Sequence, residues 1–255
     1  MGFNNKELII LKNNQKYIVG IDGCKYGWIA IKIGEDAQFS ISKHSDFNSI
    51  FKEYPSAEKY LVDMVIGLAD ENHPREVEYF ARQKLKPNRT SSVFTPPCRA
   101  AVYAKNYDTA KKKNIAILGK SFSIQAWNIV PKIREIDEFI LGNEVYKNRI
   151  FEAHPEVCFA SLNNQIPMVF KKKEKVGIEE RINLLQSIFP KSKEIFEQGN
   201  THFLKKEVKS DDLADALGLA VTGYLGMKYG FHFLFPKEKK QDIHGLEMNM
   251  IFYKY

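Results

Sequence analysis

Tyr17-Ile-Val-Gly-Ile-Asp-Gly-Cys24 is the stretch that decides how the chain folds. Its apolar and β-branched residues favour a buried strand, and the run ends on one carboxylate, Asp22. A carboxylate that closes an apolar strand is costly to remove from water unless it is paired or binds a cation. Asp-Gly is also a sequence typical of a tight hairpin turn. Two interpretations of Asp22 therefore stay open, a turn residue and a site residue.

The residues after this strand predict an antiparallel meander, then a helix and a returning strand. The helix is expected over residues 45–54, with Ser45 as its N-cap and Pro55 as its stop. Three hairpin strands followed by a helix and a returning strand are typical of a mixed sheet that helices can cover on both faces. The expected strands are residues 28–33, 38–42 and 58–63.

The middle of the chain, residues 70–142, predicts a helical insertion. We expect helices at 106–114 and 121–141, the second kinked at Pro131. Residues 88–99 are rich in hydroxyls and prolines and predict an ordered loop. The remaining expected elements are a strand at 148–152, helices at 178–189 and 210–228, and short strands within 230–235 and 248–253.

Length and composition predict one globular domain. The chain has 255 residues, of which 44% are hydrophobic, so it can bury a sizeable core. We expect a single α/β domain over residues 1–255 with its core at 17–253. Its mixed five-stranded sheet has three antiparallel strands first and helices on both faces.

Charge, cysteines and missing motifs exclude several classes of protein. A net charge of +7 favours a polyanionic partner such as nucleic acid, although solvated surface lysines explain it equally well. The three cysteines have no paired spacing, which argues against a disulfide framework or a zinc site. The sequence lacks a Gly-x-x-x-x-Gly-Lys-Ser/Thr phosphate loop and a Gly-x-Ser-x-Gly nucleophile motif.

The sequence also predicts a cytoplasmic protein outside the membrane. No apolar run approaches the ~18 residues of a membrane span. Residues Met1 to Lys6 lack the basic-then-apolar pattern of a signal peptide.

Two further acids close apolar runs, as Asp22 does. Asp63 has no turn signal beside it, so it needs a partner; a salt-bridged core aspartate is the alternative. Glu152 is followed by His154, Pro155 and Glu156. A proline in the first helical turn with a glutamate beside it is normal helix-start chemistry, so Glu156 needs no function. Glu152 and His154 have no such explanation, although His154 is expected to orient a neighbour rather than to ligate.

The late helix adds a pair of acids. Asp211 and Asp212 follow Ser210 in the first turn, where the helix dipole already favours them. Asp215 lies in the second turn among apolar residues, so a buried role is expected, while a solvated one stays open. Because Asp212 and Asp215 are three residues apart, both can face one point.

Carboxylates from separate elements can together hold two hard cations, which predicts a two-metal mechanism. Mg²⁺ or Mn²⁺ prefers oxygen ligands, and two such ions about 3.5–4 Å apart can cleave a phosphodiester. We therefore expect Asp22, Asp63, Asp212 and Asp215 to bind metal, with Glu152 completing the catalytic set.

These motifs together resemble a known family. The order of strands and acids is similar to the ribonuclease H fold, and Asp212-x-x-Asp215-Ala-Leu resembles the last acidic motif of Holliday-junction resolvases. Over residues 17–253 the chain resembles domain-of-unknown-function family 429, described as predicted nucleases of this fold. Val65 stands where that family usually has a proline. The matching stretches are 20–24 with 27–28, 62–68, 91–99, 123–126, 132–137, 152–156, 172–181 and 211–216.

The resemblance implies a ribonuclease H-like nuclease that acts on DNA or RNA. Arg99, His154 and Lys132 are expected to orient or contact the phosphate, and the matched stretches add Ser92 and Gln125 to the substrate-binding residues. A non-catalytic binding protein of the same fold is the first alternative. An actin-like nucleotide-binding relative is the second, but it requires a duplicated fold.

Two geometric expectations follow. The first strand is expected beside the strand that ends on Asp63, with the carboxylates of Asp22 and Asp63 meeting at one sheet edge. The loop over residues 90–99 is expected to cover that edge, with Arg99 facing the acids.

Overall fold

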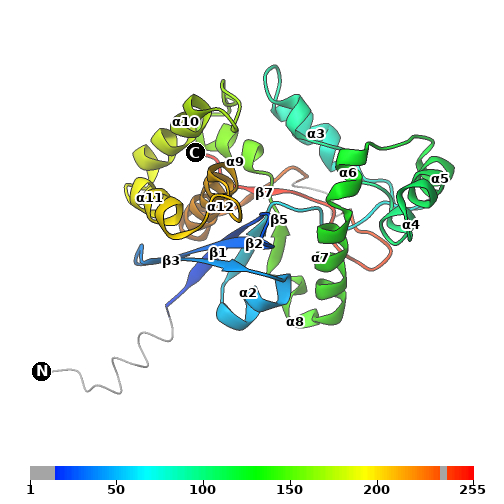
Figure 1. The fold of residues 1–255 in the computed structure, drawn as a ribbon, viewed down its shortest axis with the longest axis horizontal. Coiled ribbons are helices and arrows are strands. Elements are labelled where there is room, and N and C mark those ends of the chain that lie inside the picture. Colours follow the sequence, from blue (N-terminus) through cyan, green and yellow to red (C-terminus); the bar gives the residue numbers. More distant parts are fainter. Residues whose placement is uncertain (1–14, 236–239) are drawn as a thin grey trace, which may run out of the picture.

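A five-stranded sheet between two layers of helices forms the centre of the computed structural model (Figure 1). The structure describes residues 15–235 and 240–255, so the expectation for Met1 to Lys6 lies outside the described residues. In spatial order the strands are β3 (Phe39–His44), β2 (Trp28–Gly34), β1 (Tyr17–Gly23), β4 (Lys59–Val62) and β5 (Ile150–Glu152).

The sheet is mixed, as the sequence predicts. β1 pairs antiparallel with β2, and β2 antiparallel with β3. On its other side β1 pairs in parallel with β4, where Ile21 lies opposite Val62, and β4 pairs in parallel with β5. The carboxyl ends of β1, β4 and β5 therefore lie at the same edge of the sheet.

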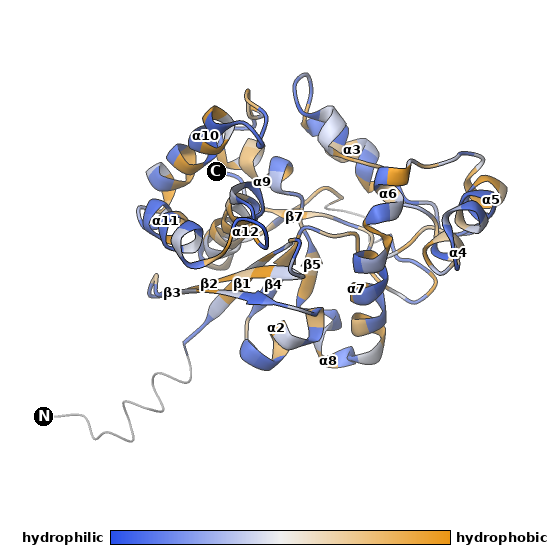
Figure 2. Ribbon diagram, viewed as in Figure 1, coloured by the Kyte–Doolittle hydropathy of each residue, from blue (hydrophilic) through white to orange (hydrophobic). Residues whose placement is uncertain are grey.

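Alternating side chains attach a different layer of helices to each face. Ile18 packs in the cluster formed by the helices of one face, whereas Val19 and Ile21 pack against Phe47 on the other. Hydrophobic residues accordingly concentrate along the sheet (Figure 2). One face carries α9 (Pro155–Leu162), α10 (Lys175–Ile188), α11 (Ser192–His202) and α12 (Ser210–Tyr229); the other carries α2 (Phe47–Glu53), α7 (Val130–Gly142) and α8 (Glu144–Lys147).

Helix α12 rests directly on β1 because the facing residues are small. A Cβ added at Gly20 would lie 2.3 Å from the backbone nitrogen of Ala220 and 2.4 Å from the carbonyl oxygen of Ala216. On the helix side, a Cβ at Gly223 would lie 2.8 Å from the Ile18 side chain. The two backbones therefore meet without intervening side chains, which fixes α12 along the strand that carries Asp22.

Residues 70–142 are largely helical, as expected, and most of them project beyond the sheet (Figure 1). The expected helix at 121–141 is instead two helices, because Pro131 lies in the first turn of α7, where a missing N–H costs nothing. The remaining helices of this segment are α3 (Val77–Lys84), η1 (Thr90–Ser92), α4 (Arg99–Val102), α5 (Tyr107–Leu118) and α6 (Ile124–Asn128).

Two other details differ from the sequence prediction. The N-cap of α2 is Asp46 rather than Ser45, because the Asp46 carboxylate accepts a hydrogen bond from the Ser49 amide at 2.9 Å. Helix α11 was not predicted. The expected tail strands exist in short form, β6 (His232–Phe233) and β7 (Ile251–Phe252), which pair with each other.

The cysteines agree with the expectation. Cys24, Cys98 and Cys158 are buried free thiols. Among the described residues, no helix is long and apolar enough to cross a membrane.

We predict that Gly20→Ala destabilises the fold. The added methyl group meets backbone atoms of α12 at 2.3–2.4 Å, which only a shift of the helix can relieve. The free energy of unfolding should fall by about 3 kcal/mol, the upper part of the overpacking range. Urea unfolding followed by circular dichroism measures this loss.

Gly142→Ala is the matched control, because no atom lies within 4 Å of a Cβ at that position. Equal stability of Gly20→Ala and the parent protein would contradict the close contact between β1 and α12.

Candidate metal centre

Three carboxylates converge where β1, β4 and α12 meet. One oxygen from each of Asp22, Asp63 and Asp215 lies within 4.8 Å of the others. We call these three residues the triad. The expectation that Asp22 and Asp63 meet at one sheet edge is confirmed, since β1 and β4 are parallel neighbours and the Asp63 amide donates to the Ile21 carbonyl at 2.9 Å.

Strand alternation explains why both strands point their acids at α12. Asp22 follows Ile18 by four residues, so both side chains leave the sheet toward the α12 layer. Asp63 follows Leu61 by two residues and shares its direction, and Leu61 packs with Leu219 of α12. The close approach of α12 then brings Asp215 to the same point.

Burial raises the pKa of every triad carboxyl, and repulsion from other triad carboxylates adds to it at Asp22 and Asp215. Burial, followed by the charges of Asp63 and Asp215, holds the pKa of Asp22 well above its usual range. Burial raises the pKa of Asp63 to about 6 and that of Asp215 to about 7, although the charge of Lys172 opposes both shifts. Three acids with raised pKa values form a site that gains from a positive charge between them.

The donor set fits a divalent metal ion. Asp215 is fully buried, and its Oδ1 atom has no hydrogen-bond partner among the described residues. A buried carboxylate oxygen without a partner is costly unless it binds a cation. The Gly23 amide donates to Oδ1 of Asp22 at 2.7 Å and orients that carboxylate. All the triad ligands are oxygens, which favours a hard cation.

One positive charge already belongs to the site. The Lys172 ammonium donates to Oδ2 of Asp215. Burial works against this charge, but the three triad carboxylates outweigh burial and raise the pKa of Lys172. Lys172 was not among the expected site residues. It begins the matched stretch 172–181, but a lysine within the run Lys171–Lys173 is most simply explained as solvated.

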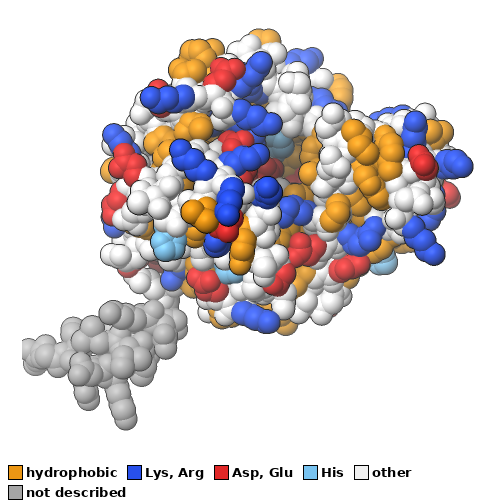
Figure 3. Space-filling model, viewed as in Figure 1, with side chains coloured by type: hydrophobic (Ala, Val, Ile, Leu, Met, Phe, Trp, Pro, Cys, Tyr) orange, Lys and Arg blue, Asp and Glu red, His pale blue; other side chains and the backbone are white. Residues whose placement is uncertain are grey.

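A cavity of about 210 Å³ opens onto Asp22 and Asp63. Val93 and Phe94 form part of its wall, which confirms that the 90–99 loop covers this edge. The front face is hollowed between the α10–α12 layer and the projecting helices, and lysine and arginine side chains gather beside the hollow (Figure 3). The cavity is thus approached past a basic surface.

His154 lines the cavity with a free lone pair. Its Nε2 lies 3.3 Å from the Ser92 carbonyl oxygen, so Nε2 carries the proton. Burial lowers the pKa of His154, which keeps the ring neutral. The Nδ1 atom is buried and has no partner among the described residues, so it can accept a proton or a ligand.

Lys132 lines the cavity on the other side of Asp22. Its methylene groups fill the space beside Gly23, and its ammonium donates to the Gly27 carbonyl and lies 4.2 Å from the Trp28 ring centroid. Burial lowers the pKa of Lys132. The charge is therefore held at the turn between β1 and β2, within the site but not paired with the triad.

A comparison with models of known protein families identifies the family of this chain. The family described as protein of unknown function (DUF429) matches residues 20–229, from β1 to the end of α12. The chain belongs to the DUF429 family. Neither the curated proteins nor the solved structures contain a significant match to it. The matched range includes all three triad residues and Lys172.

Two acids expected in the DUF429 site lie outside the triad. Asp212 accepts from the Lys209 amide at 3.0 Å and so closes the N-terminus of α12, although its charge still raises the pKa of Asp22. Glu152 is paired in register with Val62, the residue before Asp63. Both of its carboxylate oxygens accept hydrogen bonds from the Arg75 guanidinium, at 2.6 and 2.7 Å. It lines the cavity as half of an ion pair.

Three expected substrate contacts are placed differently. Arg99 does not reach the triad, because its guanidinium binds Asp137 at 2.6 and 2.9 Å and Asp242 at 2.6 Å. Ser92 is exposed and contributes its carbonyl oxygen to His154. Gln125 is exposed on α6 and does not line the cavity.

A second buried ion pair adjoins the triad. Arg181, which is fully buried, donates to Oε1 of Glu156 at 2.5 Å, and Oε2 of Glu156 is left without a partner among the described residues. The charge of Glu156 raises the pKa of Asp63 and Asp215. The helix-start explanation of Glu156 was therefore incomplete, and only its partner in space, 25 residues away, reveals this.

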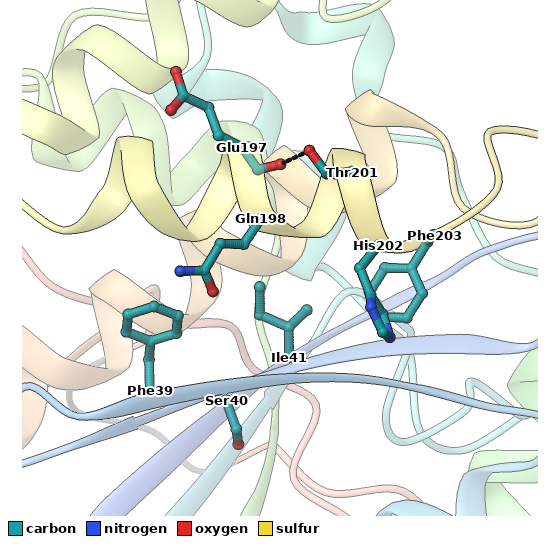
Figure 4. Close-up of a pocket in the computed structure, with 8 residues that line it drawn as sticks. All are labelled: Phe39, Ser40, Ile41, Glu197, Gln198, Thr201, His202 and Phe203. Atoms are coloured by element: carbon teal, nitrogen blue, oxygen red, sulfur yellow. Dashed lines mark hydrogen bonds between the residues drawn. The ribbon is translucent and has the colours of Figure 1, made fainter.

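Another cavity, of about 720 Å³, lies between β3 and α11 (Figure 4). Phe39 and Ile41 of β3 face Gln198 of α11 across it, whereas Ser40 points to the opposite side of the strand (Figure 4). Its lining has no convergent acids, so we do not assign chemistry to it.

We predict that the metal-free protein becomes less stable as the pH rises from 5 to 8. An unfolded aspartate has a pKa near 3.9. Asp63 and Asp215 titrate at about 6 and about 7 in the folded chain, so the folded state binds more protons in this range. Stability is therefore greatest at the acidic end and is lost as pH rises through 6 to 7. Thermal unfolding in a chelator measures it.

Asp63→Asn should reduce this pH-dependent fall in the thermal midpoint, while Asp211→Asn, outside the triad, should keep it. A midpoint that falls equally in the parent protein and Asp63→Asn would show that other groups cause the pH dependence.

We also predict that Glu152→Gln destabilises the protein without affecting metal binding. The side chains of Glu152 and Arg75 are 3% and 2% exposed, so the variant leaves a buried guanidinium with one carboxylate fewer. The free energy of unfolding should fall by about 3 kcal/mol. Glu144→Gln, which removes an exposed pair with Lys147, should change it little. A stable Glu152→Gln protein that no longer binds Mn²⁺ would place Glu152 among the ligands instead.

Proposed function

We propose that this protein is a metal-dependent phosphodiesterase that cleaves nucleic acid, built on a ribonuclease H-like core. Two observations carry the proposal: one carboxylate oxygen from each of Asp22, Asp63 and Asp215 lies within 4.8 Å of the others, and Oδ1 of Asp215 is buried without a partner among the described residues. The strand order β3-β2-β1-β4-β5, with acids at the ends of β1 and β4 and on a late helix, supports the proposed core because it resembles that fold.

The triad would hold Mg²⁺ or Mn²⁺. Carboxylate oxygens without sulfur or nitrogen ligands select cations of this kind. Such a cation supplies Lewis-acid activation of water and of the scissile phosphate when bound. Asp22 and Asp63 offer oxygens from the cavity side, and Asp215 offers one from beneath them.

Other side chains of the cavity have roles that need no metal. The neutral His154 lines the cavity, and its Nδ1, which has no partner among the described residues, can accept a hydrogen bond from a group brought against the ring. Lys132 adds a positive charge on the far side of Asp22, where it can attract a phosphate. The net charge of +7 and the basic surface beside the hollow suit a polyanionic substrate (Figure 3). Buried free thiols are consistent with a cytoplasmic location.

One observation favours a second candidate, a nucleic-acid-binding protein without catalysis. The Lys172–Asp215 pair already supplies one positive charge to the acids, so part of the repulsion is relieved without metal. An actin-like fold is less well supported, because residues 15–235 and 240–255 contain one five-stranded sheet and a two-stranded one rather than a duplicated unit.

We predict Mg²⁺- or Mn²⁺-dependent cleavage that Asp22→Asn and Asp215→Asn each abolish. Each variant keeps the side-chain shape and removes one charge from the triad, so metal affinity falls first. Cleavage of single-stranded, duplex, hybrid and junction substrates should drop at least about a thousandfold, while circular dichroism shows an unchanged fold.

Asp211→Asn, one turn from Asp215 on α12, is the matched control and should cleave like the parent protein. Binding of nucleic acid without cleavage of any substrate, at millimolar Mn²⁺, would favour the non-catalytic alternative.

A further inference from the structure

The two carboxylate oxygens of Asp215 differ in their partners. A bridging carboxylate in a two-metal site places one cation on each oxygen. In this protein Oδ2 of Asp215 accepts from the Lys172 ammonium, whereas Oδ1 is buried and has no partner among the described residues. One oxygen is therefore occupied by a lysine, and one is left for a metal ion.

The chain holds the backbone beside Lys172 in place. A Cβ at Gly177 would lie 2.0 Å from the Lys171 carbonyl oxygen, so glycine lets the start of α10 pack against this loop. The buried Arg181 donates to the Phe170 carbonyl at 3.1 Å and to the Gly177 carbonyl at 2.7 Å. Lys172 thus extends from a fixed backbone, unlike a lysine on a solvated loop.

Formal charge fits one metal ion better than two. The triad carries three negative charges, which one divalent cation and the Lys172 ammonium neutralise together. A second divalent cation would leave the site positive and would lie against the ammonium. Like charges at such short range in a partly buried site repel strongly, so a second cation would bind much more weakly than the first.

We propose that the site binds one divalent cation and that Lys172 stands in the position of a second. This inference rests on the proposed function and replaces the pair of metal ions expected from the sequence with one metal ion and a lysine. The lysine side chain is 37% exposed, so a phosphate that binds beside the triad can reach it from solvent. It can therefore neutralise charge that develops on the phosphate, a role that a second metal ion has in other sites.

The number of ions bound per chain tests the proposal. Isothermal titration of the full chain with Mn²⁺ should give one site for the parent protein. Lys172→Met should bind its first ion at least about tenfold more tightly, because a neighbouring positive charge is gone. It should also take up a second ion at millimolar concentration. Lys172→Arg should still bind one ion.

Thermal unfolding provides a readout that does not depend on activity. Without metal, Lys172→Met should melt several degrees lower than the parent protein, since Asp215 loses its partner, and Mn²⁺ should restore the midpoint. Lys173→Met, the exposed neighbour in the same loop, should match the parent protein in both assays.

Two ions bound by the parent protein, or an unchanged Mn²⁺ affinity in Lys172→Met, would overturn the proposal. Cleavage with two ions per chain rejects this inference and keeps the proposed function. One ion per chain without cleavage of any substrate rejects the proposed function and keeps this inference.

Discussion

The direct contact between α12 and β1 is the constraint on which the rest of the site depends. Because Gly20 has no side chain, the helix backbone lies against the strand, and a side chain two residues along the strand meets the second turn of the helix. A larger residue at this position would lift α12, and Asp215 would move away from Asp22. The triad is therefore positioned by backbone packing, while its own side chains repel one another.

The sheet could be predicted from the sequence because its signals are local. The apolar strand β1, the turn after it and the meander to β3 follow from composition and turn residues, and all five strands lie close to their expected ranges. Helix α11 has weaker local signals: Gly199 lies within it because Leu213 of α12 packs there, with Cδ2 2.6 Å from the position of a Cβ. Its stability comes from tertiary packing, which a single sequence does not reveal.

Only part of the site could be predicted, because some of its residues have local signals and others depend on distant partners. Strand ends identified Asp22 and Asp63, and helical spacing identified Asp215, but the partners of charged residues are distant in sequence. Lys172 lies 43 residues from Asp215, and Arg75 lies 77 residues from Glu152. The register of a strand also decides on which face of the sheet its carboxylate lies, and the sequence alone does not give the register between parallel strands. Hence Glu152, opposite Val62, finds an arginine instead of the triad.

The size of the cavity above Asp22 and Asp63 has a consequence for how an ion arrives. About 210 Å³ has room for several water molecules, so a cation can enter it with water ligands still bound. Apolar side chains such as Val93, Phe94 and Met250 line much of the wall and cannot replace lost water ligands. An entering ion must therefore exchange water for carboxylate oxygens at the triad itself. Because Mg²⁺ dehydrates reluctantly, the rate of ion exchange, as well as the affinity, would discriminate among metals at this site.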